Sequence, residues 1–418
     1  MPCVYVLEKL GKVSVMPSNT SIPAGELQTS VRRQPKSLLY SIAAGIGGSG
    51  LDAVALESLR GAKSFLGRAV AASNNQTEIP ADRITTLDYH PVRLLSALAR
   101  SHYMGAKKHT IDDIASRYLE TGEFDLLHSW SGDCVKSLRM ANRLKIPSVL
   151  EIPTWHRNKG KVKPNVTKSE RERDAAGFPQ NLFNKMLVSR QQVMEEYDRA
   201  TLIFVLSEKA RETFRIAGLP EEKLFTMHRG VDVARFTPAE TPSEKFRAIF
   251  VGSLIKRKGV HVLLEAWRKA AIPNGRLILL GTLHPEIEPF IEKYGGDDVR
   301  VSGFVRDVPS LLRQASVHVF PSELEGSAKA TYEAAACGLP QIATRESGDV
   351  VIDGENGWII PPNDVDALVE ALRAAHADRD RLVRYGRAGR ERVVQHFTWD
   401  HFRERLLDAY DLAIRRTS

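Results

Sequence analysis

The 418-residue sequence predicts an α/β protein made of two doubly wound domains, each a parallel sheet with helices on both faces. Runs typical of buried strands alternate with helical patterns through most of the chain. The alternation is interrupted once, at 237–244, by a polar segment with two prolines that is typical of a linker. The length also exceeds that of one ordinary domain, so the interruption is best explained as a domain boundary.

The first domain begins after Pro35 with a strand–loop–helix unit. The apolar run 37–45 is followed by the glycine-rich residues 46–50, and then by a helical pattern at 51–62. Further strands are expected at 65–73, 124–130, 146–152 and 200–207, and further helices at about 133–145 and 208–218. Strands separated by helices favour a parallel sheet, and we expect one here.

The second domain repeats this pattern after the linker. Strands are expected at 246–254, 275–281, 299–305, 315–322, 339–345 and 356–362, with a helix at 260–270. The last segment, 398–414, has amphipathic helical spacing and is expected to cross back to the first domain. The architecture is therefore two Rossmann-like domains facing a cleft, with ligands at the carboxyl ends of the strands.

The predicted boundaries are an N-terminal extension at 1–36, a first Rossmann-like domain at 37–238, a second Rossmann-like domain at 243–397 and a C-terminal helix at 398–418. The extension carries Pro17, Pro23 and Pro35 and has no sustained helical or strand period. At most one short hairpin is expected in it.

The composition is that of an ordinary folded protein, with 43% hydrophobic and 26% charged residues. Three widely spaced cysteines form neither a disulfide framework nor a paired zinc cluster. The N-terminus lacks the apolar core of a signal peptide and no apolar run has transmembrane length, so a cytoplasmic protein is expected.

The positive charge is unevenly distributed. Residues 1–240 hold 34 Lys and Arg against 26 Asp and Glu, whereas residues 241–418 hold 25 of each, so the whole net charge of +8 lies in the N-terminal part. This indicates an anionic partner or membrane surface there, and not a uniformly basic nucleic-acid-binding protein. A peripheral position at the inner face of a membrane fits the same pattern.

A glycine motif opens the first domain. Gly45, Gly47 and Gly50 fit the spacing G-x-G-x-x-G between a strand and a helix, which is the context of a dinucleotide site. The acidic residue that would bind a ribose at the end of the next strand is absent, because Ser73, Asn74 and Asn75 stand there. The remaining interpretations are an anion site at a helix N-terminus or only a tight turn.

The most informative stretch is 319–343, where two carboxylates flank a set of small residues. Glu325 precedes Gly326, Ser327 and Ala328, and Glu333 follows on a predicted helix. Free amides of the first helical turn could bind a diphosphate. The two carboxylates would lie about 12 Å apart if every step between them were helical, so they could grip opposite ends of one ligand. The alternative is a capping Glu325 and a solvated Glu333, although an unpaired carboxylate in so apolar a helix would be costly.

This pattern resembles the E-x7-E motif of retaining GT-B glycosyltransferases, in particular glycosyltransferase family 4. Further collinear segments resemble the same family: the phosphate-binding strand-loop at 251–259, the approach to the linker at 230–238, and the turn Gly338-Leu339-Pro340. The resemblance covers the second domain nearly throughout and the first domain loosely from about residue 37.

The resemblance implies a metal-independent enzyme without a bound cofactor that transfers a sugar from a nucleotide-sugar donor to a hydroxyl of a glycan, glycolipid or small molecule. Glu333 would bind the ribose, Glu325 the sugar hydroxyls, and Lys258 with Arg257 the diphosphate, whose charge grows as the glycosidic bond breaks. The catalytic residues indicated are Glu325, His156 and Lys258. The donor-binding residues indicated are Gly252, Ser253, Arg257, Lys258, Gly303, Phe304, Val305, Glu325, Gly326, Ser327, Ala328, Lys329 and Glu333.

The sequence departs from the family pattern at three places. Ser253 stands where many members have arginine, so the cation must come from Arg257, Lys256 or Arg229. Ala328 replaces a frequent glycine, and the turn at 281–283 lacks its second glycine. These differences concern individual contacts and leave the class unchanged.

The acceptor side is less clearly marked. The candidate acceptor residues are Gly47, Gly48, Ser49 and His128, with His156 as the alternative histidine at the edge of the donor sugar. Either histidine could instead be an ordinary residue at a strand end. The segment 157–173 holds seven basic residues against two acidic ones, which fits an anionic acceptor, acidic lipids or simply a solvated loop. Two other classes stay open, a nucleotide-sugar 2-epimerase and a non-catalytic nucleotide-sugar-binding protein.

Overall fold

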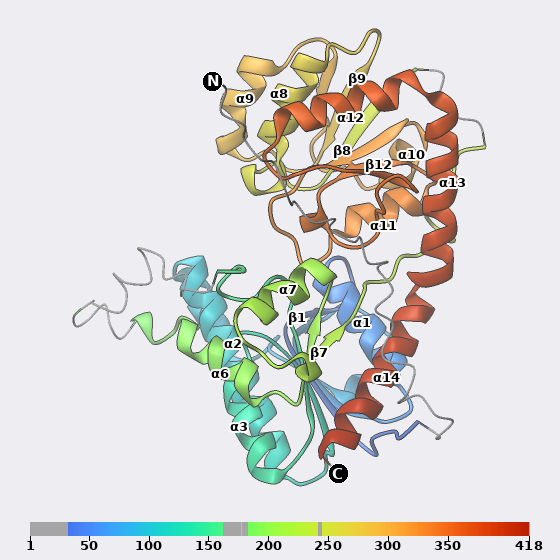
Figure 1. The fold of residues 1–418 in the computed structure, drawn as a ribbon. Coiled ribbons are helices and arrows are strands. Elements are labelled where there is room, and N and C mark those ends of the chain that lie inside the picture. The colour runs from blue at the N-terminus through green and yellow to red at the C-terminus, as the bar shows by residue number, and fades with distance from the viewer. Residues whose placement is uncertain (1–31, 162–176, 178–182, 241–244, 418) are drawn as a thin grey trace, which may run out of the picture. The chain divides into compact units, whose positions relative to one another are not determined.

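The computed structural model describes residues 32–161, 177, 183–240 and 245–417 (Figure 1). Most of the predicted extension and most of the basic segment 157–173 therefore lie outside the described residues. Residues 33–418 belong to one compact unit, and this unit contains both sheets.

The first sheet has seven parallel strands in the order β3-β2-β1-β4-β5-β6-β7. Its strands are β1 (Leu38–Ile46), β2 (Leu66–Asn74), β3 (Ile84–Thr86), β4 (Leu126–Trp130), β5 (Ser148–Glu151), β6 (Leu202–Val205) and β7 (Leu224–Thr226). The helices of this part are α1 (Leu51–Gly61), α2 (Arg100–Glu120), α3 (Val135–Leu144), α6 (Arg190–Arg199) and α7 (Glu208–Ile216), with short 3-10 turns η1 (Ala81–Arg83), η2 (Pro91–Ala97) and η3 (Glu221–Lys223).

The second sheet has six parallel strands in the order β10-β9-β8-β11-β12-β13. Its strands are β8 (Arg247–Val251), β9 (Arg276–Leu280), β10 (Val299–Val301), β11 (Val317–Phe320), β12 (Gln341–Ala343) and β13 (Gly357–Ile359). The helices are α8 (Val260–Ala270), α9 (Glu288–Tyr294), α10 (Val308–Arg313), α11 (Lys329–Ala336), α12 (Val365–Ala377) and α13 (Arg379–His396), with 3-10 turns η4 (Lys256–Lys258), η5 (Pro285–Ile287) and η6 (Arg345–Ser347).

The C-terminal helix α14 (Trp399–Thr417) returns to the first sheet, as predicted, and lies beside α1 (Figure 1). Its apolar face brings Phe402, Leu406 and Tyr410 into the same buried cluster as β1 and α1. The helix follows α13 after a break of two residues, Phe397 and Thr398, so two successive helices lead from the second sheet to the first.

Each sheet is buried on both faces, which explains the long apolar runs in its strands. In the first sheet, successive residues of β1 alternate between two clusters: Leu38, Tyr40 and Ile42 face α14, whereas Leu39 and Ala43 face α2 and α3. The expected elements are confirmed to within a few residues, and the strands β3 and β7 and the helices α2, α6, α9, α10, α12 and α13 are additions that the sequence interpretation did not assign to residues.

Candidate functional site

The strand order of the second sheet indicates where a ligand should bind. Strand β8 has β9 on one side and β11 on the other, so the connections after β8 and β11 leave the sheet toward opposite faces. Such a switch point opens a crevice at the carboxyl ends of the strands. The loops that follow β8 and β11 contain the predicted donor residues 252–258 and 325–329.

Two cations of η4 converge on one carboxylate at this point. Arg257 Nη1 lies 3.0 Å and Lys258 Nζ 3.6 Å from Glu325 Oε1. The loops are joined by the backbone as well, because the Glu323 amide donates to the Arg257 carbonyl at 2.9 Å. Two fixed positive charges beside a single carboxylate leave one positive charge available for an anionic ligand. The structure thus brings together three residues that the sequence placed in one site.

Gly252 gives Lys258 its position. An added Cβ on Gly252 would lie 3.1 Å from Lys258 Nζ, and its φ of +151° is one that other residues rarely adopt. The ammonium also lies 5.3 Å from the centre of the Phe320 ring. Ser253, next to this glycine, is exposed. The backbone conformation therefore favours glycine at this strand end, and the small residue leaves room beside the cation.

Lys256 and Arg229, the other two cations considered, lie elsewhere. Lys256 Nζ stacks over the Phe290 ring at 5.1 Å. Arg229 is buried, donates to Glu151 and lies over the Trp130 ring at 5.5 Å. Of the three, Arg257 is the residue that contacts Glu325.

The loop after β11 corrects one part of the sequence interpretation. The Glu325 amide donates to the Glu346 carbonyl at 3.1 Å and the Ala328 amide to the Ser347 carbonyl at 2.8 Å, so these two groups are not available to a phosphate. The amides of Gly326 and Ser327 have no acceptor among the described residues. Gly326 has no room for a side chain, because an added Cβ would lie 2.5 Å from the Pro153 carbonyl oxygen. It is a packing residue of the loop.

Glu333 is 7% exposed on α11 and its carboxylate contacts Lys329 Nζ at 2.8 Å. Lys329 itself is half-exposed, so the pair is open on one side. The helix begins only at Lys329, after an extended Ala328, so the 12 Å spacing that a continuous helix would impose on Glu325 and Glu333 does not apply. The carboxylate is paired, which removes the cost expected of an isolated charge.

The residues after β10 extend the same edge. The Gly303 carbonyl accepts from the Gly281 amide at 2.8 Å, which ties the loops after β9 and β10 together. Phe304 is 81% exposed, whereas Val305 packs against the buried cluster below. The exposed aromatic ring is available to a flat ligand group.

His156 lies away from these residues, inside the first domain. It is fully buried between the rings of Tyr197 and Phe214, whose centres lie 4.9 and 5.0 Å away. Its Nδ1 accepts from the Asn158 amide at 3.0 Å. Burial, helped by the positive charge of Arg190, lowers the pKa of the imidazole to about 4. The structure gives it the surroundings of a neutral core histidine.

His128 is also buried, and it belongs to a polar network under α14. Its Nδ1 lies 2.8 Å from the Tyr410 hydroxyl, and its Nε2 lies 3.3 Å from Glu151 Oε2. Burial alone would raise the pKa of Glu151, but Arg229 and His128 outweigh it and lower that pKa. Through these contacts α14 is joined to β4, and Arg229, which precedes the linker, is joined to β5. In this network the His128 side chain is fully buried.

The glycine loop of the first domain is internally bonded. The Gly45 amide donates to Asp52 Oδ1 at 3.1 Å and the Gly47 amide to the Asp52 carbonyl at 2.9 Å. Gly48 and Ser49 are exposed. A carboxylate at the start of α1 disfavours an anion at the same helix end.

Two buried acids near this loop were missed by the sequence interpretation. Asp133 Oδ2 accepts from the Ala43 amide at 2.6 Å, and its Oδ1 lies 3.7 Å from Lys108 Nζ. Glu196 accepts from the Gly132 and Cys134 amides at 2.7 and 3.2 Å. Burial raises the pKa of Asp133 to about 6 and that of Glu196 to about 7. The signal available was the motif Ser131-Gly132-Asp133 at a strand end, directly beside the strand of the glycine loop.

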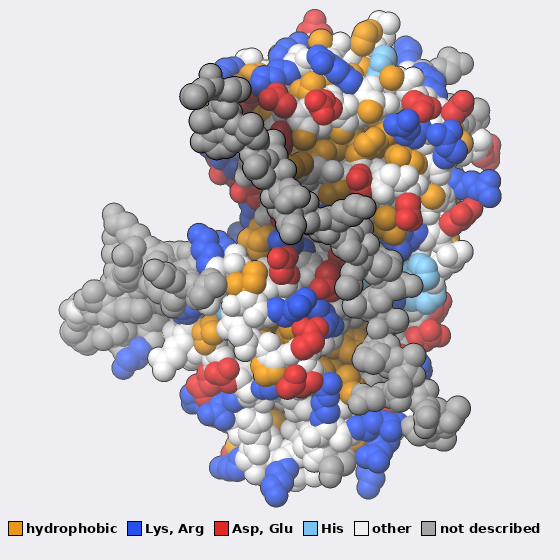
Figure 2. Space-filling model, in the orientation of Figure 1, with side chains coloured by type: hydrophobic (Ala, Val, Ile, Leu, Met, Phe, Trp, Pro, Cys, Tyr) orange, Lys and Arg blue, Asp and Glu red, His pale blue; other side chains and the backbone are white. Residues whose placement is uncertain are grey.

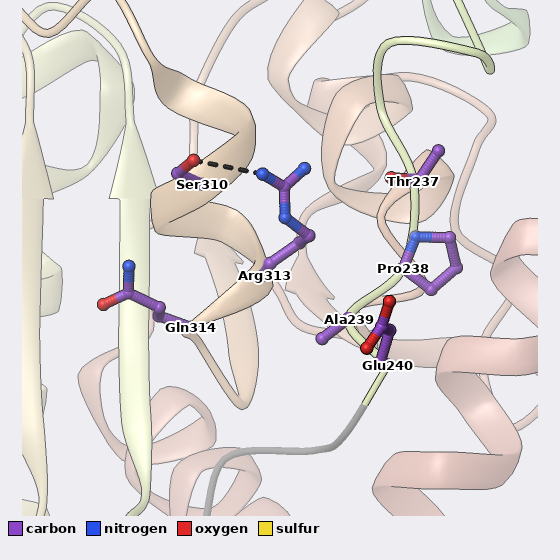
Figure 3. Close-up of a pocket in the computed structure, with 7 residues that line it drawn as sticks. All are labelled: Thr237, Pro238, Ala239, Glu240, Ser310, Arg313 and Gln314. Carbon is purple, nitrogen blue, oxygen red and sulfur yellow. Dashed lines mark hydrogen bonds between the residues drawn. The ribbon is translucent and has the colours of Figure 1, made fainter.

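A pocket of about 480 Å³ lies at the linker, outside the predicted site. Figure 3 shows Arg313 and Ser310 on α10, joined by a 3.0 Å hydrogen bond, opposite the linker residues Pro238 and Glu240. The pocket contains none of the residues of the donor site.

Among the helices that the structure describes, none combines the length and the apolar character needed to cross a membrane.

The C-terminal half matches a known family. Residues 235–392 fit the model for glycosyl transferases group 1. WcaL of Escherichia coli (strain K12) is 29% identical over 242 residues, which is 52% of this chain and 60% of WcaL. WcaL is provisionally named as a colanic acid biosynthesis glycosyltransferase. The D-inositol 3-phosphate glycosyltransferase of Kribbella flavida is 28% identical over 326 residues, 70% of this chain and 72% of that protein.

Solved structures match over more of the chain. Sucrose-phosphate synthase from Thermosynechococcus elongatus has a TM-score of 0.64 at 20% identity and covers 88% of this chain and 96% of its own. Anabaena HepE, solved with UDP-glucose, has a TM-score of 0.61 at 18% identity and covers 89% and 98%. The chain therefore has the GT-B fold, and its residues 235–392 are similar to glycosyl transferases group 1.

Proposed function

We propose that this chain is a retaining glycosyltransferase of the family 4 type, which transfers a sugar from a nucleoside-diphosphate sugar to an acceptor hydroxyl without a metal ion. The observation that carries the proposal is the convergence of Arg257 and Lys258 on Glu325 at the switch point of the second sheet. The match of residues 235–392 to glycosyl transferases group 1 supports the same reaction class.

The chemistry follows from the charges. When the bond between sugar and phosphate breaks, negative charge grows on the diphosphate, and preorganised cations stabilise it more than they stabilise the intact donor. Arg257 and Lys258 are the cations for this role, while the free amides of Gly326 and Ser327 add donors beside them. Glu325, between the cations and the sugar, would bind sugar hydroxyls. In our proposal the departing phosphate accepts the proton of the attacking hydroxyl on the same face, which retains the configuration.

Glu333 is proposed to bind the ribose. Its carboxylate is paired with Lys329 through Oε1, and a carboxylate has the acceptor capacity for two vicinal hydroxyls. Phe304, exposed after β10, and the backbone of Gly303 are the groups proposed to face the base. HepE, which has the same fold, was solved with UDP and with UDP-glucose, and this supports a nucleoside diphosphate at the corresponding edge.

A donor panel tests the reaction. Nucleoside diphosphate release from different nucleotide-sugars is measured with and without glycan acceptors, and the anomeric configuration of any product is determined by NMR. Transfer with retention is expected. An epimerised sugar with donor alone, or tight binding without turnover, would replace the proposal by an epimerase or a binding protein.

The substitution Glu333→Gln tests the site. The amide keeps the shape but loses the charged acceptor, so calorimetry should show nucleoside diphosphate binding weakened by about 1.5–3 kcal/mol with an unchanged fold. Glu323→Gln is the matched control, since Glu323 lies on the same loop with its charge directed toward His261. If both variants bind the nucleoside diphosphate with the same affinity, Glu333 does not contact the nucleotide.

A further inference from the structure

The 3-10 turn η2, between β3 and α2, carries an unusual apolar surface. With three residues per turn, Val92 and Leu95 lie on one face and pack into the cluster formed with α2 and α3. Leu94 therefore lies on the outer face, where it is 82% exposed, and Tyr89 just before the turn is 101% exposed. These are the two most exposed large hydrophobic side chains among the described residues.

The surroundings of this surface are basic. Between Asp88 and Asp112 the chain has four Lys and Arg residues and no Asp or Glu: Arg93, Arg100, Lys107 and Lys108. Arg93, next to Leu94 in the chain, and Arg100, at the start of α2, are both exposed. Asp88 lies 3.7 Å from Arg93 and Asp133 lies 3.7 Å from Lys108, so these two acids offset two of the four charges. The segment therefore exposes apolar side chains at Tyr89 and Leu94 and keeps a net positive charge.

The position of the turn is also informative. Because all strands of the first sheet are parallel, the connection after β3 leaves from the same edge as the loops after β1 and β4. That edge carries Gly48, Ser49 and the Ser131-Gly132-Asp133 loop. The apolar and basic surface thus borders the edge at which ligands of such a sheet bind.

We infer that Tyr89, Leu94, Arg93 and Arg100 form a docking surface for a membrane of anionic phospholipids. Tyr89 and Leu94 would enter the interface between headgroups and acyl chains, and the two guanidinium groups would contact lipid phosphates. A second copy of the chain fits this surface less well, because a two-fold contact would bring two sets of positive charge face to face. If the proposed function is correct, the same surface would bring a lipid-borne acceptor to the strand edge.

The test is co-sedimentation of the full chain with vesicles of phosphatidylcholine, with and without phosphatidylserine. We expect binding only to the vesicles with phosphatidylserine, and weaker binding at high salt. Tyr89→Ser combined with Leu94→Ser should reduce the partition coefficient at least tenfold, because both apolar insertions are lost. Val383→Ser, which removes a 56% exposed side chain on α13, is the matched control and should bind like wild type.

A second variant covers the case in which the first does not fold. Arg93→Gln with Arg100→Gln should lower the partition coefficient about fivefold for each charge lost. The inference is overturned if wild type binds vesicles with and without phosphatidylserine equally, or if the serine variant binds vesicles as wild type does. It is also overturned if light scattering shows that wild type is a dimer and that the serine variant is a monomer. Vesicle binding is read without any donor sugar, so failure here is separate from failure of the proposed reaction.

Discussion

The two sheets have matching switch points with opposite electrostatics. In the first sheet, at β1 and β4, Asp52 accepts from the Gly45 amide and Asp133 from the Ala43 amide, and Glu196 is buried behind them. In the second sheet, at β8 and β11, Arg257 and Lys258 face Glu325. Strand order thus determines where a site can form, but the sign of the nearby charge determines which ligand it accepts.

The glycine motif illustrates the point. Gly45, Gly47 and Gly50 have the spacing of a phosphate loop, yet the carboxylate of Asp52 stands at the helix start where a phosphate would bind. Gly252, a single glycine at the end of β8, lies close to a lysine ammonium. Positive φ at glycine is needed at both places, so glycine spacing alone does not distinguish a tight turn from an anion site.

The largest effect expected is on turnover at the second switch point. Replacing both Arg257 and Lys258 with Ala should lower kcat by about 10²–10³-fold and change donor affinity much less, because these cations act on charge that develops as the bond breaks. Steady-state kinetics with a defined acceptor measures both quantities.

Lys256→Ala provides the control for that double variant. It removes a neighbouring charge of the same turn, but its ammonium lies over Phe290 and away from Glu325. Its kinetics should match those of wild type. A raised KM with unchanged kcat in the double variant would mean that the two cations bind only the ground-state diphosphate.

The next effect concerns stability at the first switch point. Burial raises the pKa of Glu196 to about 7, so between its ordinary value of 4.5 and pH 7 the folded chain binds a proton that the unfolded chain does not. The free energy of unfolding should therefore fall as pH rises through this window, by roughly 3 kcal/mol at most from this group.

Glu196→Gln should abolish that part of the pH dependence while lowering stability by a constant amount, since the amide cannot accept from both the Gly132 and Cys134 amides. His156 contributes in the opposite direction as pH falls from 6.5 toward 4, so the informative quantity is the difference between wild type and variant. Urea unfolding from pH 4 to 8 measures it. Parallel stability curves would show that Glu196 is ionised throughout.

The sequence predicted the two sheets because buried parallel strands leave long apolar runs, which local patterns record. The family resemblance placed Arg257, Lys258 and Glu325 in one donor site, and the structure brings their side chains together where the loops after β8 and β11 meet. The sequence did not predict the burial of His128 and His156, because a histidine in a core and a histidine at a site have the same local sequence. Their surroundings come from Tyr410, Glu151, Tyr197 and Phe214, which are distant in the chain.

The use of backbone amides was equally inaccessible to sequence reasoning. Glu325 and Ala328 donate to the carbonyls of Glu346 and Ser347 in η6, and nothing in residues 325–328 indicates that pairing. The same holds for Gly326, where the Pro153 carbonyl oxygen leaves no room for a side chain. Small residues mark close approach, and only the structure identifies the approaching group.

The smallest effect is expected from Asp52→Asn, which asks whether the glycine loop of the first domain binds the donor phosphates at all. The asparagine oxygen can still accept from the Gly45 amide, so the loop should keep its shape. If the donor site lies at β8 and β11, kcat and KM for the donor should change less than twofold, and nucleoside diphosphate affinity should stay the same. If the loop does bind a phosphate, removal of the negative charge at the N-terminus of α1 should tighten that binding, most clearly at low salt, where surface charges are least screened. Calorimetric titration of wild type and variant at two salt concentrations distinguishes the two cases. A salt-dependent gain in the nucleoside diphosphate affinity of the variant would mean that the phosphate site lies in the first domain.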